Sequence, residues 1–245
     1  MKILVCITHV PDTTSKISFS EDSTSFNTQG VQFIIGPYDD YALAKAVELK
    51  QNTNAEITVL NVGLSDTEPS IRKALAIGAD KAIRINAEPT DSVFVAKEIA
   101  AIASKENYDL IMMGRESIDY NGGIVHGIVG ELLGIPSVSP VMTLEIEGRK
   151  AIMHKEIEGG KQLLEAELPL VLGCQEPIAE WKIPNMRGIM SARTKPLEVI
   201  EPSKSEKAST TISYDLPAAR SSCTLIESGN EEELVRLLKE EAKVL

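Results

Sequence analysis

Two hydrophobic patterns alternate along the first 134 residues of the chain. Short runs of branched apolar residues bounded by glycine, proline or polar residues indicate buried strands, and longer segments with apolar residues every three or four positions indicate helices. We expect strands at 2–8, 55–62, 81–85 and 110–113, and helices at 36–50, 67–77, 91–105 and 124–133. This alternation with short links predicts an α/β fold with a doubly wound, mostly parallel sheet of the Rossmann-like kind.

The pattern changes after Gly134. Residues 142–147, 150–157 and 162–168 alternate apolar and polar side chains and are separated by glycine-containing turns. This period of two predicts an antiparallel meander. Residues 169–174 are one more apolar run, which we interpret as a buried strand.

Two segments outside these patterns are more polar. The alternating pieces 16–19 and 31–34 are expected to pair as a small hairpin. Residues 200–222 contain little that could form a core. A helix is predicted at 230–243, opened by a capping box in which Ser228 precedes Glu231.

These patterns divide the chain into two parts. We expect residues 1–178 to form the α/β domain with its antiparallel extension. Residues 179–245 are expected to form a loop and an extended arm, ending in a helix, that packs on another protein; a flexible tail is the alternative.

One loop is a candidate anion site. The strand at 110–113 ends at Gly114, and Asp119, Asn121, Gly122 and Gly123 precede the next helix. Main-chain N–H groups at that helix start would point into a crevice at the carboxyl end of the strand, where open parallel sheets hold phosphate groups. An ordinary tight turn between strand and helix is the alternative.

Charge and cysteine content narrow the classes of partner and compartment. The formal charge of −11 disfavours a general nucleic-acid or anionic-membrane surface. The three cysteines, Cys6, Cys174 and Cys223, are far apart and indicate a reducing compartment rather than a disulfide framework. Neither a signal peptide nor an apolar run of membrane-spanning length is recognisable, so we expect a cytoplasmic protein.

No catalytic or metal-binding motif is present. His9, His126 and His154 lack metal-ligand spacing, and no nucleophile elbow, phosphate-binding P-loop or dinucleotide fingerprint occurs. We interpret Cys6, inside an apolar strand, as a small core residue. His126 could hydrogen-bond a ligand from the proposed phosphate helix, although a plain position on the helix face is the better interpretation. The residues therefore predict nucleotide binding and a docking arm, without a reaction.

Six stretches in order along the chain resemble the beta subunit of electron transfer flavoproteins. They are residues 10–13 (VPDT), 36–39 (GPYD), 72–80 (RKALAIGAD), 114–119 (GRESID), 155–160 (KEIEGG) and 183–190 (IPNMRGIM). The resemblance implies a heterodimer in which an alpha subunit holds a redox-active FAD, and this chain supplies an adenine-nucleotide-binding domain and an arm that clasps alpha. In most members of the family the beta site holds AMP, and in electron-bifurcating members it holds a second FAD.

The resemblance also implies individual contacts. The nucleotide would lie against strand ends, the first helix and the loop that begins at Gly114, with the phosphate on main-chain amides near Asn121 to Val125. The implied residues are Cys6, Gly36, Pro37, Tyr38, Asp39, Val62, Gly114, Ser117, Ile118, Asp119, Asn121, Gly122, Gly123, Ile124 and Val125. Ile183, Pro184 and Asn185 would anchor redox partners such as dehydrogenases, and Glu156 would face the mobile flavin domain of alpha.

The chain departs from the family pattern at the phosphate loop. Glu116 replaces the usual glutamine, and Ile124 and Val125 stand where AMP-binding members often have Gln-Thr, so a hydroxyl contact to phosphate would be lost. Three hypotheses follow: a simple carrier with structural AMP, which passes electrons between dehydrogenases such as acyl-CoA dehydrogenases and an acceptor; a bifurcating version whose second FAD oxidises NADH; and a stand-alone ATP-binding stress or signalling domain.

Overall fold

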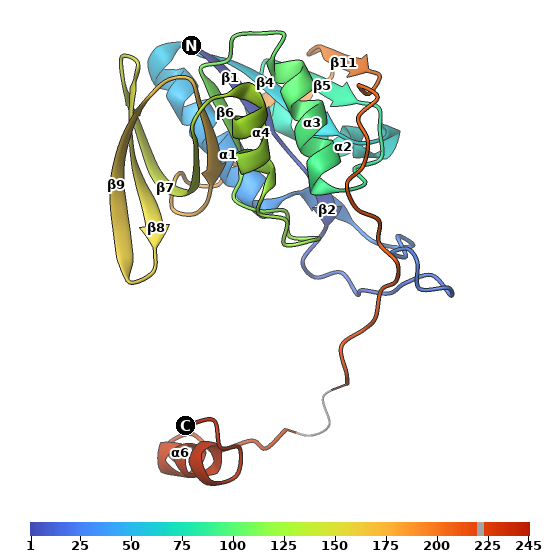
Figure 1. Cartoon of the computed structure of the whole chain (residues 1–245), viewed down its shortest axis with the longest axis vertical. Helices are drawn as coiled ribbons and strands as arrows, with labels where there is room; N and C mark the ends of the chain where they lie inside the picture. The colour runs from blue at the N-terminus through green and yellow to red at the C-terminus, as the bar shows by residue number, and fades with distance from the viewer. Residues whose placement is uncertain (220–222) are drawn as a thin grey trace. The chain divides into compact units, whose positions relative to one another are not determined.

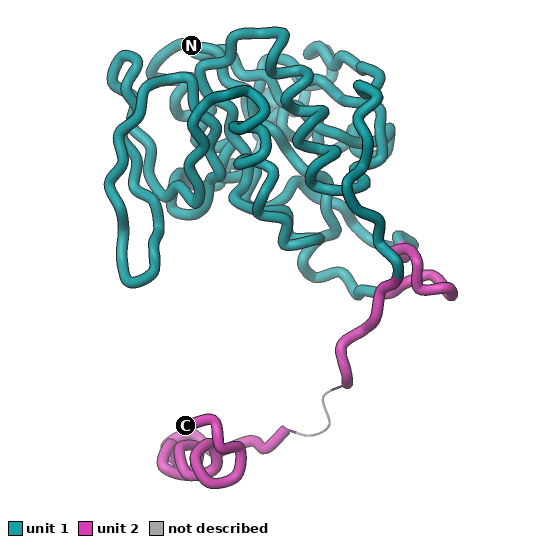
Figure 2. Tube along the Cα trace, viewed as in Figure 1, with its two compact units in different colours: residues 1–17, 28–212 teal, residues 18–27, 213–245 magenta. Residues whose placement is uncertain are grey.

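The computed structural model describes residues 1–219 and 223–245, which form two compact units (Figure 2). The first unit comprises residues 1–17 and 28–212. The second comprises residues 18–27 and the described residues from Ser213 onward.

A nine-stranded sheet forms the centre of the first unit (Figure 1). Its strands lie in the order β11-β5-β4-β1-β6-β10-β7-β8-β9. The strands are β1 (Lys2–Cys6), β4 (Glu56–Val62), β5 (Lys81–Ile85), β6 (Leu110–Gly114), β7 (Ser137–Glu147), β8 (Lys150–Ile157), β9 (Gly160–Glu167), β10 (Leu170–Cys174) and β11 (Leu197–Ile200). From β11 to β7 all neighbours are parallel, whereas β7, β8 and β9 pair antiparallel. The predicted doubly wound fold and its antiparallel meander are both confirmed.

Helices cover both faces of the parallel strands (Figure 1). One face carries α1 (Pro37–Thr53), the 3-10 turn η1 (Ser65–Thr67), α2 (Glu68–Ile77) and α5 (Met186–Ala192), and the other carries α3 (Ser92–Ala103) and α4 (Val125–Leu133). The alternation of side chains along a strand explains the two cores: Ile3 and Val5 pack with α1 and α2, and Leu4 packs with α3. Because both faces are buried, the parallel strands are apolar throughout.

The strand order reverses direction between β1 and β6. From β1 the chain builds β4 and β5 on one side, and after α3 it returns to build β6, β10 and β7 on the other. The links leaving β1 and β6 therefore diverge, and this topology predicts a ligand-binding crevice at the carboxyl ends of these two strands.

The predicted hairpin between 16–19 and 31–34 is wrong. The second segment overlaps β3 (Phe33–Ile35), which pairs antiparallel with β2 (His9–Pro11) instead of with residues 16–19. Pro11 is tolerated because it ends a short strand of a two-stranded sheet, where a missing donor costs little. The His9 ring stacks on Phe33 with centroids 4.7 Å apart, an additional side-chain contact between the two strands.

Two elements after residue 178 were not predicted. Helix α5 begins at Met186, with the Asn185 side chain accepting a hydrogen bond from the Gly188 N–H, and β11 adds a parallel edge strand beside β5. Residues 179–212 therefore pack within the first unit. The assignment of residues 179–245 to partner recognition stays a prediction.

The chain beyond β11 is held on α3 by two carboxylates. Glu98, only 2% exposed, accepts hydrogen bonds from the N–H and hydroxyl groups of Ser203 at 2.8 and 2.7 Å. Asp91 caps the start of α3 with one oxygen and accepts from the Ala208 N–H with the other. The beginning of the arm thus has a fixed course along the domain.

The second unit is small and has few internal contacts. The rings of Phe19 and Tyr214 stack with centroids 4.9 Å apart, and the Tyr214 N–H donates to the Ser23 carbonyl. Its helix α6 (Glu231–Glu240) confirms the predicted terminal helix, but the predicted Ser228 cap is wrong, since the N-cap residue is Asn230.

No side chain of α6 is buried, and its apolar Leu234 and Val235 are exposed. Across the described residues, no helix is both long and apolar enough to cross a membrane.

Replacing Glu98 by alanine should release the arm from α3. The loss of two hydrogen bonds to a buried carboxylate predicts a free energy of unfolding lower by about 1–3 kcal/mol and faster proteolysis within residues 201–212. Urea unfolding measures the free energy, and limited proteolysis followed by mass spectrometry measures the rate of cleavage within residues 201–212. Glu131→Ala, which removes an exposed acid on α4, is the control. Equal cleavage of the two variants would contradict the anchoring role.

Candidate functional site

Asp39, in the first turn of α1, ties together the two strands that flank the crevice. Its Oδ2 atom accepts hydrogen bonds from the Thr8 N–H at 2.8 Å and the Thr8 hydroxyl at 2.6 Å, just beyond β1. Its Oδ1 atom accepts from the N–H of Gly114, the last residue of β6, at 2.7 Å. The carboxylate therefore joins the carboxyl ends of β1 and β6 and fixes the start of α1 beside them.

Burial changes the acidity of the groups at this junction. Desolvation raises the pKa of Asp39 to about 6, although its three hydrogen bonds favour the charged form. The pKa of the Cys6 thiol is raised well above its usual range by burial and by the nearby Asp39 charge. Cys6 is therefore an unreactive core residue, and only its main chain is available to a ligand.

Two of the expected ligand glycines are required by packing. A Cβ atom at Gly36 would lie 2.4 Å from the Thr8 hydroxyl oxygen, and one at Gly114 would lie 2.7 Å from the Tyr38 Cβ. Both contacts are shorter than side-chain atoms permit. Pro37 follows Gly36 as the first residue of α1, so this part of the motif begins the helix and brings it close to β6.

The loop from Arg115 to Ile124 is closed on itself. Ser117 donates to the Asp119 carboxylate in a short hydrogen bond, and the Gly122 N–H donates to the Ser117 carbonyl at 3.2 Å. Asn121 has a positive φ of 49°, and the Gly123 N–H donates to its carbonyl. This tight turn brings the loop back to the start of α4.

The start of α4 suits an anion. Its N-cap residue, Ile124, provides no side-chain acceptor, and its first turn contains no acidic residue. The first-turn N–H groups of a helix lack partners within the helix, so these amides are available to phosphate oxygens. The residues present therefore fit the phosphate end of a nucleotide.

The expected nucleotide residues fall into two groups. Cys6, Asp39 and Gly114 meet at the junction of β1 and β6, and the 115–125 loop, with Ile118 half-buried, leads from this junction to α4. Val62 ends β4 on the far side of β1, buried among apolar side chains. All lie at the carboxyl edge of the sheet.

His126 supports this loop from below. Its imidazole lies 3.4 Å from the Ser137 hydroxyl, and hydrogen bonds to the main chain at Gly123 and Arg115 favour its protonation. Desolvation outweighs them and lowers its pKa. The neutral ring thus links the two ends of the loop.

Among the described residues there is no cluster of three side chains that could hold a metal ion.

Glu156, the expected partner contact on β8, is joined to the loop. Its carboxylate accepts from the Gln175 amide at 2.5 Å, and Gln175 in turn accepts from the Arg115 guanidinium at 2.8 Å. Arg115 lies 5.0 Å from the centroid of the Tyr38 ring and 3.2 Å from a Glu116 oxygen. Sequence reasoning missed Gln175 because nothing local relates it to residues 60 and 19 positions away.

The expected recognition segment is exposed on a fixed base. Ile183 and Met186 are 73% and 74% exposed. Just before them, the Trp181 indole donates to Asp40 at 3.0 Å, and Lys73 pairs with the same carboxylate. The segment is thus held against the first turn of α1.

Helix α5 continues this base. Arg72 donates to the carbonyls of Ala192 and Lys195, and a Cβ atom at Gly188 would lie 2.2 Å from the Ala76 carbonyl oxygen on α2. The side chain of Asn185 caps α5, and its expected contact with a partner stays a prediction. An asparagine followed by apolar residues at 186, 189 and 190 is a helix-start signal that could have revealed α5.

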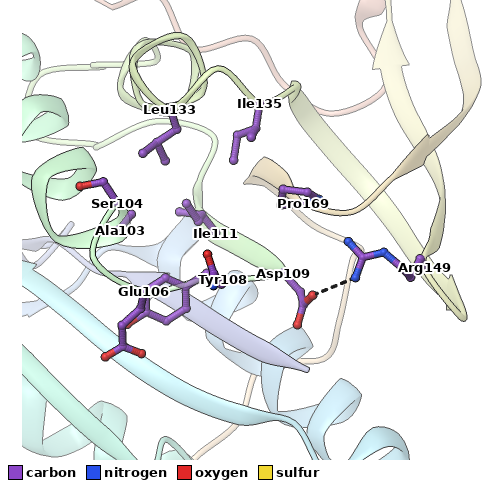
Figure 3. A pocket seen from close by; sticks show the side chains of 11 residues that line it. Ala103, Ser104, Glu106, Tyr108, Asp109, Ile111, Leu133, Ile135, Arg149 and Pro169 are labelled. Carbon is purple, nitrogen blue, oxygen red and sulfur yellow. Dashed lines mark ion pairs between the residues drawn. The ribbon is translucent and has the colours of Figure 1, made fainter.

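A cavity of about 400 Å³ lies at the opposite, amino edge of the sheet (Figure 3). Ile111, Leu133 and Ile135 line its apolar side, and Asp109 pairs with Arg149 at its rim. Its acids are already matched by cations, since Glu106 pairs with Lys2 and Lys81. The cavity does not adjoin the crevice.

Comparison with known proteins identifies related sequences. Residues 23–205 match the family model of the electron transfer flavoprotein domain. The chain is 32% identical to the electron transfer flavoprotein subunit beta of Bacillus subtilis (strain 168), with complete coverage of both chains. It is 33% identical to the subunit of the same name from Syntrophomonas wolfei, covering 94% of this chain and 92% of that one. It is 31% identical to the acryloyl-CoA reductase electron transfer subunit gamma of Anaerotignum propionicum, covering 82% and 78%.

Because its pKa is raised, Asp39 should make the folded state less stable as pH rises, whereas a salt-bridged acid makes it more stable. Between its usual value of 3.8 and about 6, the folded state binds more protons than the unfolded state, so ionisation of Asp39 lowers stability as pH rises. An asparagine here cannot ionise, but its NH₂ group would face an N–H donor, so Asp39→Asn should be destabilised by about 1–3 kcal/mol at pH 5.

Urea unfolding of both proteins at pH 5 and pH 7 measures this effect. The stability difference should shrink by about 1 kcal/mol at the higher pH, because only the wild type loses the contribution of a protonated Asp39. A difference that is the same at both pH values would contradict the raised pKa.

Proposed function

This chain belongs to the electron transfer flavoprotein family, whose beta subunits it matches over nearly its whole length, and we propose that it is the beta subunit of a heterodimeric electron carrier. The full-length match is the observation that carries the proposal, because it includes the segments that lie outside the nucleotide fold. The alpha subunit is the implied partner. The exposed helix α6 and the arm, which follows β11 and is held on α3, provide surface for that partner to cover.

The nucleotide in this subunit is AMP in the proposed carrier. The N–H groups at the start of α4 hold its phosphate, and the carboxyl ends of β1 and β4 face its adenosine part. The Asp39 carboxylate, which binds Thr8 and Gly114, holds the strand ends on which the nucleotide rests. The site contributes order rather than a chemical step.

Electrons pass through the FAD of the alpha subunit, which supplies the redox chemistry when bound. Ile183 and Met186, exposed on the base formed by α2 and α5, meet the dehydrogenase. Acyl-CoA dehydrogenases are the proposed class, supported by the relative whose name makes it a subunit of acryloyl-CoA reductase. Glu156 faces the mobile flavin domain of alpha, where an exposed ion pair would hold that domain weakly.

A bifurcating carrier is the second candidate. Ile124 and Val125 provide no hydroxyl group at the start of α4, which favours a ligand other than AMP, and a second FAD in this subunit would then oxidise NADH. A stand-alone ATP-binding domain is disfavoured by membership of the family.

Nucleotide content separates these candidates. The chain is co-expressed with a candidate alpha subunit, and nucleotides released from the purified complex are counted against protein. One FAD and one AMP per heterodimer support the simple carrier, whereas two FAD and no AMP support the bifurcating one. A colourless chain that contains ATP and needs no partner would refute both.

A carboxylate at the start of α4 should separate folding from binding. Ile124→Asp places an acid near the free amides, where it stabilises the helix start by up to about 1 kcal/mol but repels a phosphate. We expect nucleotide affinity at least about tenfold weaker with unchanged or higher thermal stability. Ile124→Asn, which can cap without charge, is the matched control and should weaken binding less. Unchanged affinity in Ile124→Asp would place the phosphate elsewhere.

A further inference from the structure

Three side chains connect the exposed end of β8 with the loop that follows β6. Glu156 accepts from Gln175, Gln175 accepts from Arg115, and Arg115 is the first residue of the 115–125 loop. The main chain is tied at the same place, since the Arg115 N–H donates to the Cys174 carbonyl at 2.9 Å. We call Glu156, Gln175 and Arg115 the relay.

Gln175 can adopt only one orientation while both neighbours are in place. The residue is only 6% exposed, and its main-chain N–H donates to the Val141 carbonyl. A guanidinium only donates hydrogen bonds and a carboxylate only accepts them, so the amide oxygen must face Arg115 and the amide nitrogen must face Glu156. If either charged group leaves, the buried amide loses a partner and its orientation is no longer fixed.

Arg115 connects the Gln175 side chain to the loop. Its guanidinium lies over the Tyr38 ring and pairs with Glu116, so its position sets that of the next residue. Its Nε atom is buried without a hydrogen-bond partner, so Gln175 and Glu116 supply the acceptors that hold the group. The acceptor at Gln175 is correctly oriented only while Glu156 is bound to the other end.

We propose that the relay couples the surface at Glu156 to the nucleotide loop. A cationic group of a partner that binds Glu156 competes with Gln175 for the carboxylate, weakens the hold on Arg115 and lowers the affinity of the loop for its nucleotide. Thermodynamic linkage requires the reverse effect to be equal, so bound nucleotide disfavours the cation at Glu156 by the same factor. The identity of the ligand rests on the proposed function; the relay itself does not.

Binding measurements on the full chain test the coupling. AMP and, in parallel, FAD are titrated by calorimetry into the wild type, Glu156→Ala, Gln175→Met and the double variant. Because Glu156 is exposed, its replacement leaves the core intact. We expect Glu156→Ala to weaken binding about fivefold in the wild type and not at all in the Gln175→Met background. Glu158→Ala, which removes the same charge two residues away and outside the relay, should have no effect.

Hydrogen exchange in the absence of nucleotide provides a second reading. Main-chain amides of residues 115–125 should exchange faster in Glu156→Ala than in the wild type or Glu158→Ala. If exchange responds but the wild type binds neither nucleotide, the relay stands and the proposed nucleotide site is refuted. If a nucleotide binds and neither affinity nor exchange responds to Glu156→Ala, the relay is refuted and the proposed function stands.

Discussion

The buried carboxylate of Asp39 is the interaction on which the rest of the structure depends. In a doubly wound sheet the links that leave β1 and β6 run in opposite directions, so the sheet itself does not bridge the space beyond the ends of these two strands. Asp39 spans this space from outside the sheet by binding Thr8 and Gly114 at once. Burying the Asp39 carboxylate costs desolvation free energy, and the hydrogen bonds that it makes fix the separation of the two strand ends.

Three consecutive residues in the first turn of α1 contact three different parts of the structure. Tyr38 lies under Arg115 and thereby meets the loop and the relay, while Asp39 holds the strand ends. Asp40 receives Trp181 and Lys73 and so fixes the segment before Ile183. Three consecutive residues therefore position the proposed nucleotide site, the proposed flavin-domain contact and the proposed recognition segment relative to one another.

Much of this fold follows from local pattern, and the exceptions have physical causes. The four strands and four helices expected within residues 1–134 were predictable, because each is marked by a continuous run or a regular spacing of apolar residues. The pairing of β2 with β3 was not, since Pro11 is a strand breaker everywhere except at a position that needs no donor. Strand β11 was missed because its four residues follow a polar segment and are stabilised only by β5. At the site, Gly36 and Gly114 were identified through resemblance, yet their sequence cannot distinguish close packing from ligand contact.

The edge position of β11 has a consequence for how the chain is made. Until residues 197–200 are available, β5 has a free side with unpaired main-chain groups, which is a template for pairing with another chain. During synthesis from the amino terminus, that edge remains open while almost the entire nucleotide fold is already outside the ribosome. The segment that closes it leads directly into the arm held by Glu98 and Asp91. Truncated or stalled chains that lack this segment would therefore be the forms most prone to aggregate.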